Sequence, residues 1–166
     1  YPRIYEITWE IDRYLRGEVP GDHSIVLRIV AFKAATSVFL KHPYFGTGTG
    51  DSQYELNKYF EQSEPVIPES LRKPPHNQYL TLLMTFGFFG FIIQMTAIFL
   101  PVYIEKKYRN YFVRIFFLIL LLSMFSDDTL DTQTGISFFM FFYSVFIFGC
   151  KNSIDLSGSD YDGLTK

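Results

Sequence analysis

The hydrophobic positions of this chain form two regions with different patterns. Before residue 79, apolar residues stand at helical spacing among many charged ones, whereas long, nearly uncharged apolar runs follow. Residues 79–104 contain 26 residues without a formal charge, and about 20 apolar residues suffice for a helix to cross a bilayer core. The pattern therefore predicts an all-α protein with a polar lobe, residues 1–78, and a membrane region, residues 79–150.

Two shorter apolar segments, 111–126 and 136–150, complete the predicted set of about three transmembrane helices. Arg114 stands near one end of the first, where its side chain can reach the membrane interface. The second is short for a membrane helix, so it needs flanking residues or a locally thin bilayer. A buried core helix of a soluble protein is the alternative for this segment.

Cap residues and prolines divide the polar lobe. Ser24 and Asp51 are suitable N-caps for helices, and the prolines between residues 64 and 75 predict an extended loop. Arg28 and Lys33 interrupt the second helix, so we expect it to lie at an interface or to be buried, and not to span the membrane. The expected helices cover residues 2–16, 25–41 and 52–62.

The charges of the loops predict an orientation. The 105–110 loop has three cations and one anion, whereas the 126–135 loop has three aspartates and no cation. Because positive loops stay on the cytoplasmic side, we expect the 126–135 loop and the polar lobe outside. Residues 151–166 then form a cytoplasmic tail, which is polar, rich in glycine, serine and aspartate, and expected to be disordered.

Composition narrows the possibilities further. A net charge of −2 gives no reason to expect nucleic acid as a partner. The single cysteine, Cys150, cannot form an internal disulfide. The chain begins with tyrosine and shows no signal peptide, so we expect a fragment of a longer membrane protein.

Three polar features could carry chemistry. In the GTGTG run, Gly46, Gly48 and Gly50 alternate with threonines, and consecutive N–H groups in such a turn can bind an anion. The run lacks the Rossmann and Walker A spacings, so a plain tight turn is the alternative. Arg28 is either a side chain that reaches the interface or a clamp on a phosphate, because its guanidinium is a planar fork of donors.

His76 and Asn77 precede the first long apolar segment. Either residue could cap the helix that begins near Tyr79. Alternatively, His76 is a general base at an external membrane site, since an imidazole exchanges protons near neutral pH. Neither a cysteine nor a second histidine stands at metal-ligand spacing, so we predict no metal. Asp127, Asp128 and Asp131 either form a solvated loop or face the same external site.

Three segments in this order resemble the C-terminal part of the O-antigen ligase family, which also includes O-antigen polymerases. They are SIVLRIVAFKAA, HPYFGTGTGD and HNQYLTLLMTFGFFGF, and the resemblance covers about residues 1–150. It implies a glycosyltransferase of the bacterial inner membrane with a large periplasmic loop and no cofactor. Its donor is a glycan on an undecaprenyl-diphosphate carrier. A ligase passes this glycan to the lipid A core, and a polymerase passes it to another carrier-linked repeat.

The resemblance also implies roles for individual residues. Arg28 matches a loop arginine thought to engage the diphosphate, and His76 matches a loop histidine implicated in transfer. Phe32 departs from the family pattern, in which a tryptophan is common. We expect a ligase that acts on the lipid A core. A polymerase, a ligase with a protein acceptor and a non-catalytic membrane assembly subunit remain alternatives. The expected substrate-binding residues are Arg28, Gly46, Gly48, Gly50 and Asn77.

Overall fold

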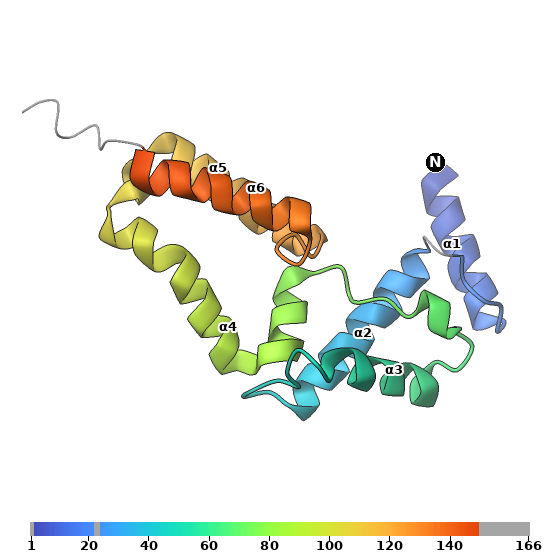
Figure 1. The fold of residues 1–166 in the computed structure, drawn as a ribbon. Helices are drawn as coiled ribbons and strands as arrows, with labels where there is room; N and C mark the ends of the chain where they lie inside the picture. The colour runs from blue at the N-terminus through green and yellow to red at the C-terminus, as the bar shows by residue number, and fades with distance from the viewer. Residues whose placement is uncertain (1, 22–23, 150–166) are drawn as a thin grey trace, which may run out of the picture. The chain divides into compact units, whose positions relative to one another are not determined.

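The computed structural model of the protein describes residues 2–21 and 24–149, and among these residues it contains helices and loops but no strand, as predicted (Figure 1). The predicted tail, 151–166, lies outside the described residues. Short 3₁₀ turns cover Glu69–Leu71 and Lys107–Arg109, and a π-helical turn covers Val145–Gly149. The α-helices are α1 (Pro2–Leu15), α2 (Ile25–Lys41), α3 (Ser52–Ser63), α4 (Gln78–Ile104), α5 (Tyr111–Ser126) and α6 (Gln133–Ser144).

The helix ends follow the cap residues. Ser24 caps α2 as predicted, because its Oγ accepts a hydrogen bond from the Val26 N–H at 3.1 Å. Asp51 precedes α3 but makes no capping hydrogen bond with its side chain. Helix α6 begins three residues before the predicted start because Thr132 caps it, accepting from the Gly135 N–H at 3.1 Å.

The chain forms two compact units, and the division falls inside α4. The first unit covers Tyr1–Ile93 with Phe125–Asp128, and the second covers Gln94–Met124 with Thr129–Lys166. The first turns of α4 belong to the first unit because Leu80 and Met84 are buried in its core. The polar part of the chain thus folds together with the start of the first long apolar segment.

Helix α2 lies at the centre of the first unit. Its apolar residues pack against Leu56 and Phe60 of α3 and Ile67 of the following loop. Ala34 and Ala35 are completely buried, and their small side chains allow neighbouring elements to approach α2 closely. The predicted location of α2 at an interface or in the protein interior, and not across the membrane, stays a prediction with respect to the membrane. The buried residues of α2 are Val26, Leu27, Val30, Ala31, Ala34, Ala35 and Val38.

Hydrogen bonds of Tyr14 and Glu10 attach α1 to the rest of the first unit, and the Ile25 N–H donates one of them to Glu10 Oε2 at 3.3 Å. The Tyr14 hydroxyl donates a hydrogen bond to the Glu64 carboxylate after α3. The Ser24 hydroxyl donates to Glu10 Oε2 at 2.9 Å. Burial, and then the hydrogen bond to Glu64, raise the pKa of the Tyr14 phenol above its ordinary value.

The raised pKa of Tyr14 predicts a loss of stability in alkali. The folded protein favours the neutral phenol, so this contribution is complete below the unfolded pKa of about 10 and is lost as the pH rises above it. Thermal unfolding between pH 8 and 11 should therefore show a steeper decline for wild type than for Tyr14→Phe. The exposed Tyr54 supplies the control: Tyr54→Phe should decline as wild type does. Equal slopes for wild type and Tyr14→Phe would contradict the assignment.

Helix α4 is interrupted at Gly87, whose φ of 66° and ψ of −171° are not helical. The 43–48 loop fills the interruption with backbone hydrogen bonds. The N–H groups of Thr47 and Gly48 donate to the carbonyls of Met84 at 3.1 Å and Thr85 at 2.8 Å. On the other side, the N–H groups of Phe88 and Phe89 donate to the carbonyls of Pro43 at 2.8 Å and Tyr44 at 3.2 Å. The break therefore leaves these backbone groups paired.

Two glycines make this close approach possible. A Cβ added at Gly46 would lie 2.3 Å from the Thr85 carbonyl oxygen, and one added at Gly87 would lie 2.4 Å from the Tyr44 carbonyl carbon. Both residues also have positive φ, 69° and 66°, which costs a residue with a side chain free energy. We call this arrangement of the 43–48 loop and Gly87 the glycine interlock.

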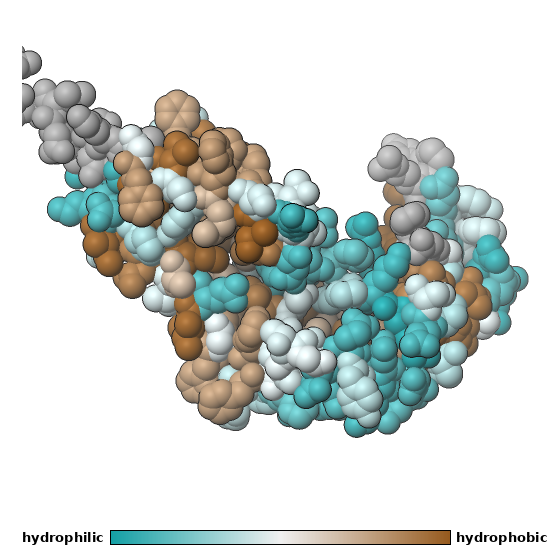
Figure 2. Space-filling model, in the orientation of Figure 1, coloured by the Kyte–Doolittle hydropathy of each residue, from teal (hydrophilic) through white to brown (hydrophobic). Residues whose placement is uncertain are grey.

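Among the described residues, α4 is the helix long and apolar enough to cross a membrane. Only 22% of its most apolar window is buried, whereas the core helix of a soluble protein would be mostly buried. Helices α5 and α6 are shorter and apolar, and aromatic pairs such as Phe116–Phe139 pack them together. Figure 2 shows hydrophobic side chains over α5, α6 and the later part of α4, and hydrophilic ones over α3.

Candidate functional site

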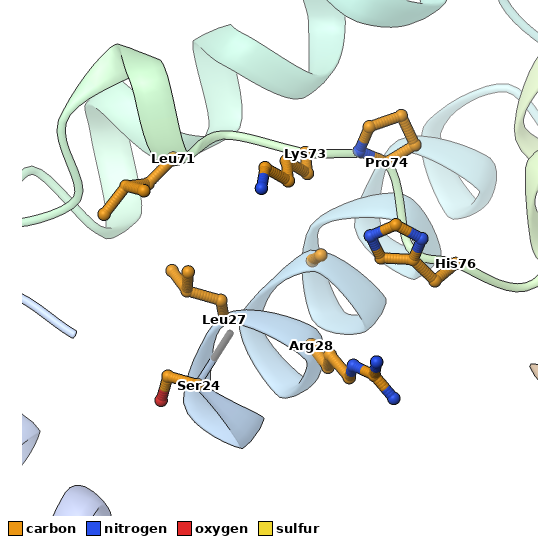
Figure 3. Close-up of a pocket in the computed structure, with 8 residues that line it drawn as sticks. Ser24, Leu27, Arg28, Leu71, Lys73, Pro74 and His76 are labelled. Carbon is orange, nitrogen blue, oxygen red and sulfur yellow. The ribbon is translucent and has the colours of Figure 1, made fainter. Parts of the chain in front are cut away.

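An open pocket of about 170 Å³ lies between the start of α2 and the loop before α4 (Figure 3). Arg28 from α2 and His76 from the loop both line it, although they are 48 positions apart in the sequence. The fold therefore brings the two predicted catalytic residues to one place. The remaining lining residues are Ser24, Leu27, Ala31, Leu71, Lys73 and Pro74.

Both walls of the pocket are held by identifiable interactions. The Ser24 cap fixes the first turn of α2, and Arg28 projects from the next turn. Arg72 holds the opposite loop, with its Nε donating to the Ile67 carbonyl at 3.3 Å and its Nη1 lying 3.3 Å from Glu61 Oε1. Pro74 and Pro75 then keep the chain extended as it passes over α2.

The pocket lining is basic. Arg28, Lys73 and His76 contribute nitrogen-bearing side chains, and the lining contains no carboxylate. Within the described part of the chain, no carboxylate forms an ion pair with the Arg28 guanidinium. In Figure 3 the Lys73 amino group points toward the Leu71 side of the pocket, and Arg28 and His76 lie together at the other end. Such a pocket favours an anion, and a phosphate suits the arginine fork.

Lys73 was not among the predicted site residues. Its side chain lines the pocket because the loop crosses α2, and this crossing is a feature of the tertiary structure. A local signal was nevertheless present: Arg72 and Lys73 are the cations of the loop between α3 and His76.

A carboxylate lies beside His76. Asp127 Oδ1 is 3.5 Å from His76 Nδ1, which is long for a hydrogen bond but close enough for electrostatic attraction. A carboxylate at Nδ1 favours a proton on that nitrogen, which leaves Nε2 able to accept one. Of the three aspartates after α5, the structure brings Asp127 and Asp128 close to His76. Asp131 belongs to the second unit.

Asn77 anchors the loop that carries His76. Its Oδ1 accepts from the Leu80 N–H at 3.0 Å, so Asn77, and not His76, caps α4. Its Nδ2 donates to the Phe125 carbonyl at 2.9 Å. His76 itself has a φ of 48°, in the left-handed region. Both polar ends of the Asn77 side chain are therefore engaged, and its predicted role in substrate binding stays a prediction.

A second bond links the same two segments. The Thr81 hydroxyl donates to Asp128 Oδ1 at 2.8 Å. Together with the bond from Asn77 to Phe125, it holds the end of α5 against the start of α4. These contacts explain how Asp127 comes to lie beside His76, 51 positions earlier in the sequence.

The first residues of the GTGTG run form part of the glycine interlock. The N–H groups of Gly46, Thr47 and Gly48 donate to the carbonyls of His42, Met84 and Thr85. None of the three predicted glycines lines the pocket beside Arg28. Their geometry thus accounts for a tight turn, the alternative left open by the sequence, and their predicted part in substrate binding stays untested. Gly50 lies in the turn before α3, with open space around its Cα.

The side chains of His76, Asp127 and Asp128 each offer one ligand atom, and these atoms lie within 4.8 Å of one another. Imidazole nitrogen and carboxylate oxygen are ligands that divalent transition metals accept. No motif predicts this set, because His76 is far from Asp127 and Asp128 along the chain. The predicted absence of a metal is therefore a prediction to be tested directly.

A family model described as O-antigen ligase matches residues 3–95, which is 93 of the 166 residues. The match spans α1, α2, α3 and the interrupted start of α4. It contains Arg28, Lys73, His76 and the glycine interlock. No curated protein and no solved structure matches the chain.

Proposed function

Because the chain belongs to the O-antigen ligase family, we propose that it transfers a glycan from an undecaprenyl-diphosphate carrier to a lipid A core acceptor. The observation that carries this proposal is the pocket that Arg28, Lys73 and His76 line without an acidic lining residue. A diphosphate is the part of the donor that such a basic pocket suits. The family is membrane-associated, and α4 has the length and composition of a membrane helix.

In this proposal, the acceptor hydroxyl attacks the anomeric carbon while the bond from that carbon to the diphosphate breaks. His76 Nε2 takes the proton of the hydroxyl, and the neighbouring Asp127 stabilises the resulting imidazolium. Negative charge grows on the departing diphosphate, where Arg28 and Lys73 offset it. Stabilisation of charge that develops in the transition state is usually a large part of catalysis.

If Arg28 binds the donor diphosphate, replacing it by lysine should weaken donor binding. Arg28→Lys keeps the charge but loses the planar fork of donors, so carrier-linked donor should bind less tightly at an unchanged membrane level of protein. Lys33→Gln is the control, because Lys33 is an exposed cation of the same helix outside the pocket. Binding would be measured with labelled donor in membranes. Wild-type affinity in Arg28→Lys would remove Arg28 from the donor site.

We further propose that the protein lies in the bacterial inner membrane with the lobe in the periplasm and the 105–110 loop in the cytoplasm. The test uses a Cys150→Ser background, since Cys150 is the one cysteine. A cysteine in place of the exposed Ser70 should react with an impermeant reagent in whole cells, and one in place of the exposed Arg109 should not. The reverse labelling would overturn both the orientation and the periplasmic site.

The proposed ligase and its three alternatives predict different lipids or glycoproteins in a strain that lacks the gene. A ligase predicts long, carrier-linked glycans that are not joined to their acceptor. A polymerase predicts single carrier-linked repeats, and a ligase with a protein acceptor predicts unmodified protein with normal lipopolysaccharide. Unchanged lipids and proteins would indicate a non-catalytic assembly subunit. Mass spectrometry of extracted lipids and of glycoproteins, with the gene restored as a control, distinguishes these outcomes.

Metal independence is a separate prediction. Transfer should survive EDTA, because Arg28 and Lys73 supply positive charge to the diphosphate without an ion. If transfer does depend on a metal, His76, Asp127 and Asp128 are the residues expected to bind it. Loss of transfer in EDTA, with recovery on adding one divalent ion and no recovery in Asp128→Asn, would show a metal site.

A further inference from the structure

Four aromatic side chains gather where the glycine interlock meets α4. Tyr44 and Phe45 come from the 43–48 loop, and Phe88 and Phe89 follow Gly87 in α4. The ring centroid of Phe89 lies 6.2 Å from that of Tyr44 and 5.6 Å from that of Phe45, and 6.2 Å from that of Phe88. We call these four residues the break cluster.

The break cluster is exposed although its backbone is firmly held. Phe45 is 80% exposed and Tyr44 is 64% exposed. Phe88 and Phe89 each expose about half of their side chains, and their N–H groups bond to the Pro43 and Tyr44 carbonyls. A contiguous aromatic surface on a fixed backbone marks a place that an apolar or interfacial medium covers.

The length and composition of helix α4 indicate that this medium is the lipid bilayer. Its first part, up to Phe86, packs into the core of the first unit, where Leu80, Leu82 and Met84 are buried. Its second part, 88–104, has no formal charge and is about 25 Å long at 1.5 Å per residue. The hydrocarbon core of a bilayer is about 30 Å thick. Lipid can therefore surround only the second part of α4, because the first part is packed in the first unit. The break cluster lies at the start of this second part.

We propose that the outer interface of the bilayer lies at the Gly87 break, where the break cluster anchors the protein among the lipid headgroups. Tyrosine is enriched at this depth because its ring is apolar and its hydroxyl is polar, and the phenylalanines lie against the acyl chains just beneath. The glycine interlock then fixes the depth of the 43–48 loop relative to the helix. This inference goes beyond the proposed activity, since it concerns membrane depth and not glycan transfer.

The test places single tryptophans at known depths in the intact protein, reconstituted in phosphatidylcholine vesicles. Trp9 is the one tryptophan, so Trp9→Phe gives a dark background. Phe45→Trp and, independently, Tyr44→Trp report on the break cluster. Tyr54→Trp is the aqueous control, because Tyr54 of α3 is 65% exposed, similar to Tyr44. Thr96→Trp, near the middle of the second part of α4, is the deep control.

Lipids brominated near the headgroup or near the acyl chain end then quench the fluorescence according to depth. Both break-cluster variants should show blue-shifted emission and stronger quenching by the shallow label than by the deep one. The aqueous control should show neither, and the Thr96 variant should respond most to the deep label. Unquenched, red-shifted emission from both break-cluster variants would overturn the proposal, as would quenching with the depth profile of the Thr96 variant. Glycan transfer is not part of the measurement, so its outcome is independent of the proposed activity.

Discussion

Replacing His76 by alanine should lower glycan transfer by about 10² to 10⁴-fold, the usual contribution of a general base. The imidazole lies in the basic pocket with Arg28, and its Nδ1 faces Asp127 at 3.5 Å. The variant loses the group that takes the acceptor proton but keeps the cations that face the diphosphate. Donor binding should therefore remain, and single-turnover transfer, normalised to the membrane level of protein, should fall.

Three further variants define the role of His76. His76→Gln should recover part of the activity if the imidazole serves only as a hydrogen-bond partner, and none if it moves a proton. Asp127→Asn should cause a smaller loss with a changed pH profile, because Asp127 acts through His76. His42→Ala is the matched control, since His42 is another exposed histidine of the first unit outside the pocket. Wild-type transfer by His76→Ala would eliminate it as the base.

Gly87→Ala should remove most of the folded protein from the membrane. The backbone of Gly87, with a φ of 66° and a ψ of −171°, lies in a region that is essentially restricted to glycine, and holding a residue with a Cβ there costs about 1–3 kcal/mol. The new Cβ would also lie 2.4 Å from the Tyr44 carbonyl carbon, and no side-chain rotation can relieve an overlap with backbone. Displacing the 43–48 loop would break the hydrogen bonds that Phe88 and Phe89 donate to it. Folded protein would be measured by thermal unfolding in detergent and by size-exclusion chromatography of fluorescently tagged variants.

The glycines of the GTGTG run provide graded controls. Gly46→Ala should match Gly87→Ala, because it has both a positive φ and a backbone overlap at 2.3 Å. Gly48→Ala should be intermediate, since its φ is 85° but the space around it is open. Gly50→Ala should keep wild-type levels of folded protein, having neither feature. Equal folded levels for all four variants would contradict the glycine interlock.

The helices were predictable because their signals are local. Ser24 caps α2 as expected, and α5 begins and ends at the predicted residues. The family resemblance and the positions of Arg28 and His76 also followed from short segments. The interruption of α4 was not predicted, because Gly87 stands in an uncharged apolar run where glycine is ordinary in membrane helices. Its significance comes from a loop 40 residues earlier that enters the break.

The composition of the site was harder to predict because it depends on distant contacts. Asp127 reaches His76 only because Asn77 and Thr81 bond to residues at the end of α5. Lys73 joins the pocket only because an extended, proline-containing loop crosses α2. Neither contact leaves a periodic or motif-like trace in the sequence. By contrast, Asn77 as the cap of α4 was one of the two alternatives that the sequence offered.

The most direct test of the central claim is single-turnover transfer by the purified membrane protein in liposomes. The donor would be a labelled glycan on undecaprenyl diphosphate, and the acceptor would be lipid A core. Wild type should move the label to the acceptor and release the carrier diphosphate in equal amount, whereas His76→Ala should bind the donor but move almost none of it. Donor that binds to wild type without any transfer to this acceptor, or transfer that is the same in wild type and His76→Ala, would contradict the account.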